Sequence, residues 1–249
     1  MIAIIGGSGL TQLANLEITR RQIVRTPYGE PSGPLTFGRM GASEVVFLAR
    51  HGYGHTLAPH EINYRANLWA LHLQGVTRII SICTVGGIAP ALGAGTIALP
   101  DQIIDYTWGR PSTYFEGSEQ PVTHIDFTHP YDEDTRGMVL AAAQAAGVPL
   151  IDGGTYAATQ GPRLETKAEI DRLDRDGATM VGMTGMPEAA LARELRVGYA
   201  ALAVVVNPAA GRGSSAHAVS MGEIGRVIEE TMGKVRLIVA KMVERHAGS

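Results

Sequence analysis

The chain has 249 residues, enough to bury a sizeable core, and we expect a single domain over residues 1–249. A hydrophobic fraction of 45% and a charged fraction of 18% exclude a disordered or fibrous chain. The formal net charge of -3 argues against a nucleic-acid partner, and the single cysteine, Cys83, excludes an intrachain disulfide and suits a reducing compartment.

Short apolar runs bounded by Gly, Pro or Asp recur from the N-terminus onward. The first run, Ile2–Ile5, is too short for a signal peptide or a spanning helix, and so are the later ones; we therefore expect a cytoplasmic protein with no membrane partner. The runs that predict strands are Ile2–Ile5, Val45–Ala49, Arg78–Cys83, Thr96–Leu99, Leu150–Tyr156, Thr179–Gly182 and Tyr199–Val206. Helical patterns cover His60–Gln74, Glu133–Ala146, Glu165–Asp176, Pro187–Arg196 and Val219–Val243.

This alternation of strands and helices predicts the α/β class, with a mixed, largely parallel central sheet flanked by helices. In such folds ligands bind beyond the carboxyl ends of the strands, so the side chains that follow each strand carry the functional information. The stretch Glu116–His124, "EGSEQPVTH", has no periodicity and predicts a long surface loop.

The first strand is followed by the glycine turn "GGSGL", Gly6–Leu10. Its amide N–H groups and the Ser8 hydroxyl are suited to holding an anion, although a tight turn without a ligand is an equal alternative. The spacing completes neither G-x-G-x-x-G nor a P-loop, so neither a dinucleotide nor ATP is favoured.

Polar side chains also follow the next strands. Arg50 and His51 come after Val45–Ala49, and a guanidinium beside an imidazole can pair with phosphate. Thr84 and Thr184 add hydroxyl groups at two more strand ends; the alternative for Thr184 is the N-cap of the following helix. Each residue alone is a weak signal, but together they predict an oxyanion site.

Two further residues are suited to reading a heterocycle. Glu165 lies at the start of a predicted helix and Asn207 ends the strand "VVVN". A carboxylate accepts a ring N–H, and an amide both donates and accepts. The alternatives are a helix cap for Glu165 and a turn residue before Pro208 for Asn207.

Several ordered motifs identify a family. "IIGGSGL", "RHGYGH" followed by "INYRAN", "DQIIDYTWGRPSTYFEG", "GPRLET", "GMTGMPEAALARE" and the strand ending at Asn207 together resemble the trimeric purine nucleoside phosphorylase and methylthioadenosine phosphorylase family over nearly the whole chain. The resemblance implies a pentosyltransferase of purine salvage, in which phosphate attacks C1′ of a purine nucleoside and releases the base. It also implies a homotrimer that uses inorganic phosphate as co-substrate and needs no metal or organic cofactor.

The resemblance assigns roles to individual residues. The implied phosphate-binding residues are Ser8, Arg50, His51, Thr84 and Thr184. The implied purine-binding residues are Leu164, Glu165, Met183, Asn207 and Ala209, with Met183 also beside the ribose. The residues implied to carry catalysis are Asn207, His51 and Arg50, and Asn207 would donate to N7 as charge builds on the departing purine.

The base is predicted from three of these positions. In the branch of the family specific for 6-aminopurines, the position of Asn207 is an aspartate, that of Ala209 is a second aspartate, and that of Glu165 is a serine. Here an amide can face a 6-oxo group, and the carboxylate can accept from the N1–H of a 6-oxopurine. The resemblance therefore implies a hypoxanthine or guanine base.

The 5′ end is predicted to be apolar. Phosphorylases of ordinary inosine and guanosine carry a histidine fourteen residues after the asparagine, and this chain has Met221 there, with Ile224 close by. A thioether packs against a methylthio group but cannot donate to a hydroxyl. The resemblance also implies that His124 reaches the methylthio end of a neighbouring subunit's site.

Together the two ends predict phosphorolysis of S-methyl-5′-thioinosine to hypoxanthine and 5-methylthioribose 1-phosphate. Two alternatives share the chemistry: a methylthioadenosine phosphorylase with relaxed base choice and a 6-oxopurine nucleoside phosphorylase. A nucleoside-binding module without turnover is the alternative from another class, and the complete set of anion-binding residue types argues against it.

Overall fold

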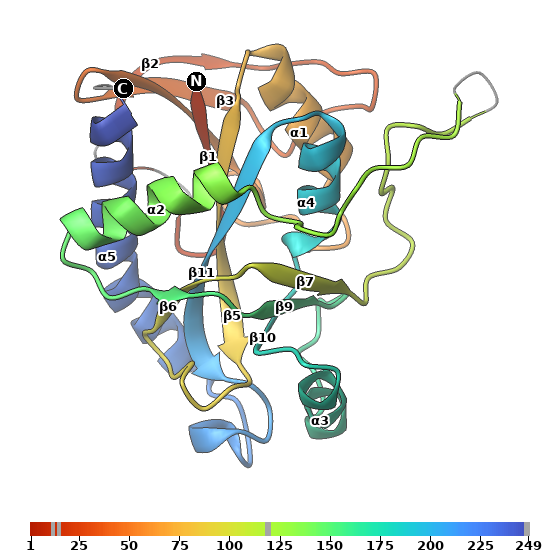
Figure 1. The fold of residues 1–249 in the computed structure, drawn as a ribbon, viewed down its shortest axis with the longest axis vertical. Helices are drawn as coiled ribbons and strands as arrows, with labels where there is room; N and C mark the ends of the chain where they lie inside the picture. Colours follow the sequence, from red (N-terminus) through yellow and green to blue (C-terminus); the bar gives the residue numbers. More distant parts are fainter. Residues whose placement is uncertain (11–12, 14–15, 118–120, 247–249) are drawn as a thin grey trace.

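One mixed sheet runs through the middle of the molecule, with helices on both of its faces (Figure 1). The computed structural model describes residues 1–10, 13, 16–117 and 121–246. The strands in that part of the chain are β1 (Ile2–Gly6), β2 (Glu17–Gln22), β3 (Leu35–Met40), β4 (Ser43–Ala49), β5 (Arg78–Gly87), β6 (Ile97–Leu99), β7 (Gln102–Asp105), β8 (Ile151–Asp152), β9 (Thr155–Ala158), β10 (Met180–Gly182) and β11 (Gly198–Pro208). The helices are α1 (Tyr64–Leu73), α2 (Glu133–Ala145), α3 (Lys167–Arg175), α4 (Gly185–Glu194) and α5 (Met221–His246), with a short 3-10 helix η1 (Gly213–Ser215).

The strand order confirms the mixed, largely parallel sheet. The strands follow the order β2-β3-β4-β1-β5-β10-β9-β7, while β11 pairs with β5 and β6, and β6 pairs with β8. Strand β1 is parallel to β4 and β5, β11 to β5, β9 to β7 and β10, and β6 to β8. Antiparallel pairing occurs between β2 and β3, β3 and β4, β5 and β10, and β6 and β11.

The two largest clusters of the core lie one on each face of the sheet, and a third, smaller cluster includes Ile170 and Leu173 of α3. Successive side chains of a strand point to opposite faces, so Ile79 packs in one buried cluster while Ile80 packs in the other. Helices α1 and α4 contribute Leu68 and Leu191 to the first cluster. Helices α2 and α5 cover the opposite face and lie side by side in Figure 1. This double cover explains why the central strands are apolar throughout.

Every expected strand is present, but three others were not anticipated. Strand β2 is exposed along its whole length at the sheet edge, so its sequence "EITRRQ" has no apolar alternation to detect. Strands β3 and β7 also carried no sequence prediction. The expected strand Leu150–Tyr156 is divided into β8 and β9 by Gly153 and Gly154, whose φ values of 94° and 111° interrupt extended backbone.

Three expected helices, α1, α3 and α5, begin later than predicted, and for α1 and α3 a cap residue sets the start. Helix α1 begins after Asn63, whose side chain accepts from the Ala66 N–H at 3.0 Å. Helix α3 begins after Thr166, which forms a capping box with Glu169.

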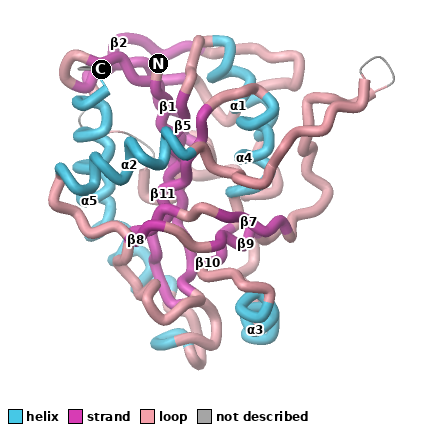
Figure 2. The backbone as a smooth tube through the Cα atoms, viewed as in Figure 1, coloured by secondary structure: helices cyan, strands magenta, loops and turns pink. Residues whose placement is uncertain are grey.

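A long loop connects β7 to α2 and runs away from the sheet and helices (Figure 2). Within the predicted surface loop 116–124, the described residues are exposed, and Ser118–Gln120 lie outside the described residues. No helix in the described ranges is both long and apolar enough to cross a membrane.

Candidate active site

The ends of five strands, β1, β4, β5, β10 and β11, contribute to one cavity of about 470 Å³. Every predicted site residue except His124 lines it. These residues are Ser8, Arg50, His51, Thr84, Leu164, Glu165, Met183, Thr184, Asn207, Ala209, Met221 and Ile224. Residues far apart in the sequence are therefore brought together, as expected for the carboxyl edge of an α/β sheet.

The glycine turn after β1 lies directly against the second polar cluster. A Cβ on Gly7 would lie 2.6 Å from the Ile82 carbonyl oxygen and 3.0 Å from Arg50 Nη1. Only glycine permits this approach, which places Ser8 and Arg50 on the same wall of the cavity. The Ser8 hydroxyl is 2.8 Å from His55 Nε2, a second imidazole to which the sequence had assigned no role.

The Arg50 guanidinium forms a fully buried ion pair with Glu188 of α4. Nε donates to Glu188 Oε2 at 2.8 Å and Nη2 donates to Oε1 at 3.0 Å, and both side chains are 0% exposed. Nη1 donates to the Ile82 carbonyl at 2.9 Å, and Nη2 also donates to the Ser81 hydroxyl. Burial alone disfavours the charged guanidinium, but the Glu188 carboxylate outweighs it and raises the pKa of Arg50.

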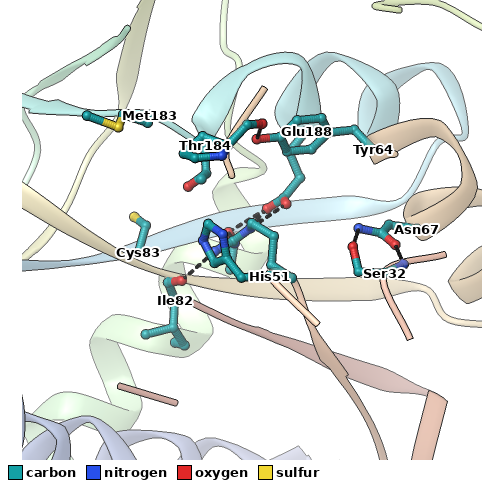
Figure 3. A network of polar contacts seen from close by, with 12 residues as sticks. Ser32, His51, Tyr64, Asn67, Ile82, Cys83, Met183, Thr184 and Glu188 are labelled. Atoms are coloured by element: carbon teal, nitrogen blue, oxygen red, sulfur yellow. Dashed lines mark hydrogen bonds and ion pairs between the residues drawn. The ribbon is translucent and has the colours of Figure 1, made fainter. Parts of the chain in front are cut away.

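This pairing changes what Arg50 offers to an anion. The guanidinium has five N–H donors, and the contacts above use four of them, so one Nη1 hydrogen is left for the cavity. Figure 3 shows Glu188 reaching from its helix toward His51 and Ile82, with Thr184 close by. The positive charge of Arg50 is thus balanced inside the protein rather than left free for a ligand.

His51 is held by the backbone of the following loop. Its Nδ1 lies 2.9 Å from the Leu57 carbonyl oxygen, and the side chain is buried. Burial, and then the neighbouring Arg50 charge, lower the pKa of His51 from 6.5 to about 4. The imidazole is therefore neutral near pH 7, with its ring 4.6 Å from that of His55.

The two threonines present hydroxyls to the same region. Thr184 occupies the N-cap position of α4, but its side chain makes no capping hydrogen bond. The capping alternative for Thr184 therefore finds no support, and its buried hydroxyl lines the cavity. Thr84 is half-buried in β5, beside Val204 of β11.

A carboxylate and an amide lie at the other end of the cavity. Glu165 precedes the capping pair of α3, so it is not the helix cap; its Oε1 accepts from the Thr159 hydroxyl at 2.6 Å. Asn207 lies where the β11 register shifts, and its Nδ2 donates to the Pro208 carbonyl at 2.6 Å. One amide hydrogen of Asn207 and Oε2 of Glu165 remain for a ligand.

The third region of the cavity is apolar. Met221, the first residue of α5, is 69% exposed, and Ile224 and Ile228 follow it along the same cavity wall. Val219 extends this surface. A thioether and branched aliphatic side chains suit an apolar ligand group.

The sequence as a whole matches the family model of the phosphorylase superfamily over residues 1–244. The chain belongs to this superfamily. A probable S-methyl-5′-thioinosine phosphorylase of Pseudomonas syringae pv. tomato is 52% identical over 241 residues, which cover 97% of each chain. A 6-oxopurine nucleoside phosphorylase of Pyrococcus furiosus is 49% identical over 84% of this chain and 80% of that one.

A solved phosphorylase structure has the same fold. The methylthioadenosine phosphorylase of Schistosoma mansoni in complex with adenine superposes with a TM-score of 0.95 at 30% identity, over 100% of this chain and 92% of that chain. The predicted α/β nucleoside phosphorylase fold is confirmed.

His124 is the predicted site residue that the cavity does not include. It is exposed on the long loop between β7 and α2. Its role in a neighbouring subunit's site stays a prediction.

Two charged residues that organise this phosphorylase site were missed by sequence reasoning. Glu188 carries one signal in the sequence: it is an acid within the apolar stretch "MPEAAL", which begins two residues after Thr184. Arg110 is buried and donates to the carbonyls of Gln160 at 2.9 Å, Met183 at 2.8 Å and Met186 at 2.6 Å. Nothing local in the sequence indicates this contact between distant segments.

The lowered pKa of His51 predicts a pH-dependent stability. Between pH 6.5 and about 4 the unfolded chain binds a proton at His51 that the folded protein does not, so the free energy of unfolding falls as pH falls through this window. Urea unfolding at a series of pH values measures the slope. We expect His51→Gln to flatten it relative to the exposed-site control His60→Gln; an equal slope in both variants would contradict the burial argument.

Proposed function

We propose that this phosphorylase cleaves S-methyl-5′-thioinosine with inorganic phosphate, giving hypoxanthine and 5-methylthioribose 1-phosphate. The observation that carries the proposal is a single cavity that joins an oxyanion cluster, a carboxylate and amide pair, and an apolar end. The names of the Pseudomonas syringae and Pyrococcus furiosus relatives, a methylthioinosine and a 6-oxopurine phosphorylase, support the same substrate class.

At one end the cavity offers phosphate several hydrogen-bonding groups. The hydroxyls of Ser8, Thr84 and Thr184 and the free Nη1 hydrogen of Arg50 are suited to anionic oxygens. Holding phosphate in line with C1′ lowers the barrier chiefly by positioning it. Phosphate is then a co-substrate, and we propose that the reaction needs no metal or organic cofactor.

At the base end the remaining polar atoms fit a 6-oxopurine. The free amide hydrogen of Asn207 donates to N7, and this bond strengthens as negative charge develops on the departing purine. The Thr159 hydroxyl fixes one oxygen of Glu165, which leaves the other to accept from the N1–H of hypoxanthine. Adenine has no N1–H, so the carboxylate discriminates against it.

The reaction itself is tested by its phosphate dependence. Methylthioinosine is incubated with the protein with and without phosphate, and the products are followed by chromatography and ³¹P NMR. The proposal expects equal amounts of hypoxanthine and a new sugar phosphate, formed only when phosphate is present. Release of base without phosphate would show a hydrolase, and no release would favour the binding-module alternative.

The apolar 5′ end gives a substitution with a directional result. Met221→His replaces a thioether by a hydrogen-bonding group, so the ratio of kcat/KM for inosine to that for methylthioinosine should rise by about tenfold. Met221→Leu, which keeps the site apolar, is the matched control and should leave the ratio near the wild-type value. An unchanged ratio in Met221→His would place the 5′ group elsewhere.

The second candidate is a general 6-oxopurine nucleoside phosphorylase. It is favoured by the similarity to the Pyrococcus furiosus enzyme and by the high exposure of Met221. It differs in expecting inosine to be cleaved as efficiently as methylthioinosine.

We further propose a single catalytic domain, a homotrimer and a cytoplasmic location. The family match over residues 1–244 supports the single domain. The long loop bearing His124 exposes Trp108 and Val122, which supports contact with a neighbouring subunit. The one cysteine, Cys83, is buried and free, as suits a reducing compartment, and the acidic net charge supports partners that are small molecules rather than nucleic acid.

A further inference from the structure

His51 differs from the other polar groups of the oxyanion cluster in what it can offer. A carbonyl oxygen only accepts hydrogen bonds, so the contact between Nδ1 and the Leu57 oxygen at 2.9 Å requires the hydrogen on Nδ1. In a neutral imidazole the other nitrogen then carries a lone pair and no hydrogen. Nε2 of His51 is thus an acceptor.

The surroundings keep the ring neutral. His51 is buried next to the Arg50 guanidinium, and both burial and that positive charge lower the pKa of His51 to about 4. Glu188 faces the guanidinium, which donates from Nε and Nη2 to that carboxylate. His55 packs beside the ring and contacts Ser8, so within the described residues nothing donates to His51 Nε2.

The charges that line this end of the cavity also argue for a protonated ligand. The charge of Arg50 is balanced by the buried Glu188 behind the cavity wall, His51 is neutral, and Ser8, Thr84 and Thr184 contribute hydroxyls. An oxyanion without hydrogens would place its own lone pairs next to the lone pair of His51 Nε2. Two acceptors would then face each other in a partly buried site, and Nε2 would lack a hydrogen-bond donor. An oxyanion that carries a hydroxyl removes this conflict.

We propose that His51 Nε2 accepts a hydrogen bond from the hydroxyl of a protonated oxyanion, so that the site selects monohydrogen or dihydrogen phosphate over anions such as sulfate that carry no proton. The inference rests on the proposed function, because it takes phosphate as the co-substrate. The phosphate keeps its proton on binding, and His51 thereby turns the unprotonated oxygens toward the hydroxyl donors and C1′. His51 is then the residue that determines the choice of anion.

Anion binding in the absence of nucleoside tests this directly. At mildly alkaline pH, phosphate is mainly the monohydrogen dianion, so sulfate matches its charge and differs in the missing proton. Arsenate has phosphate's shape and its hydroxyl. Calorimetric titration should give a Kd for sulfate at least about tenfold above that for phosphate, with arsenate close to phosphate. A sulfate Kd within about threefold of the phosphate Kd would overturn the inference.

Two variants separate acceptor from donor roles. In His51→Gln the amide can turn its NH₂ toward the ligand, so the ratio of sulfate Kd to phosphate Kd should fall to within about threefold of unity. Ser8→Ala removes a donor available to both anions and should weaken both equally, which leaves the ratio unchanged. If the ratio of sulfate Kd to phosphate Kd in His51→Gln equalled that of the wild type, the inference would be overturned. The titrations of the wild-type protein test the inference even if neither variant folds.

The outcomes separate this inference from the proposed function. Equal binding of sulfate and phosphate with normal hypoxanthine release removes the anion selectivity alone. Strong selectivity for phosphate without hypoxanthine release supports the role of His51 and contradicts the proposed reaction.

Discussion

Glu188→Gln should lower the free energy of unfolding by about 3–5 kcal/mol, because it leaves the guanidinium of Arg50 buried without a counter-charge. Both side chains are 0% exposed, so water cannot replace the lost carboxylate. Oε1 of Glu188 also accepts from the Ser81 hydroxyl at 2.6 Å and the Tyr199 hydroxyl at 2.8 Å, so the carbonyl oxygen of glutamine takes that position. The amide NH₂ then faces Arg50 Nε, and two donors meet where the carboxylate accepted at 2.8 Å. Urea unfolding of the purified variant and the wild type measures the difference.

The matched control is an ion pair on the surface of α5. Arg226 and Glu230 lie 3.0 Å apart with more than half of each side chain exposed. Glu230→Gln should change the free energy of unfolding by less than about 1 kcal/mol. A similarly small loss of unfolding free energy in Glu188→Gln would show that Arg50 is either uncharged or hydrated in the folded protein. It would then contradict the conclusion that Glu188 occupies the donors of Arg50.

Asn207→Asp should lower kcat for methylthioinosine by about a hundredfold, because a carboxylate has no hydrogen to donate to N7 and places negative charge beside a departing purine anion. The amide of Asn207 uses one hydrogen to donate to the Pro208 carbonyl, with Nδ2 2.6 Å from the carbonyl oxygen, and its other hydrogen is available to the base. Steady-state kinetics with methylthioinosine and methylthioadenosine measure the effect, and we expect the preference to move toward the 6-aminopurine.

Asn63→Asp is the control for this change of amide to acid. Asn63 lies outside the cavity and caps α1 through its Oδ1, a function that aspartate retains. Its kcat should stay at the wild-type value. If Asn207→Asp also kept kcat within about threefold, Asn207 would not be the N7 donor.

The fold was predictable where one strand or helix carries its own signal. Ile2–Ile5 and Tyr199–Val206 are buried on both faces, so their unbroken apolar runs are visible in the sequence. Strand β2 is stabilised by its pairing with β3 at the edge rather than by burial, which leaves no such mark. The late starts of α1 and α3 depend on which residue caps the helix, and periodicity alone does not settle that.

The site was predictable as a set of positions but not as a set of interactions. Motifs after the strands indicated Ser8, Arg50, Thr84 and Asn207, and one cavity contains them all. The partner of Arg50 lies 138 residues further along the chain, so its neutralisation by Glu188 is a property of the folded state. The same holds for His51, whose protonation depends on a carbonyl and on burial, neither of which a motif displays.

The most direct measurement is the release of base from methylthioinosine, methylthioadenosine and inosine, each at the same concentration with phosphate and in a phosphate-free control. If Glu165 and Asn207 read a 6-oxopurine and Met221 receives a methylthio group, hypoxanthine release from methylthioinosine will be fastest. Faster release of adenine from methylthioadenosine would contradict the reading of the base edge. Faster release of hypoxanthine from inosine would contradict the assignment of the 5′ end.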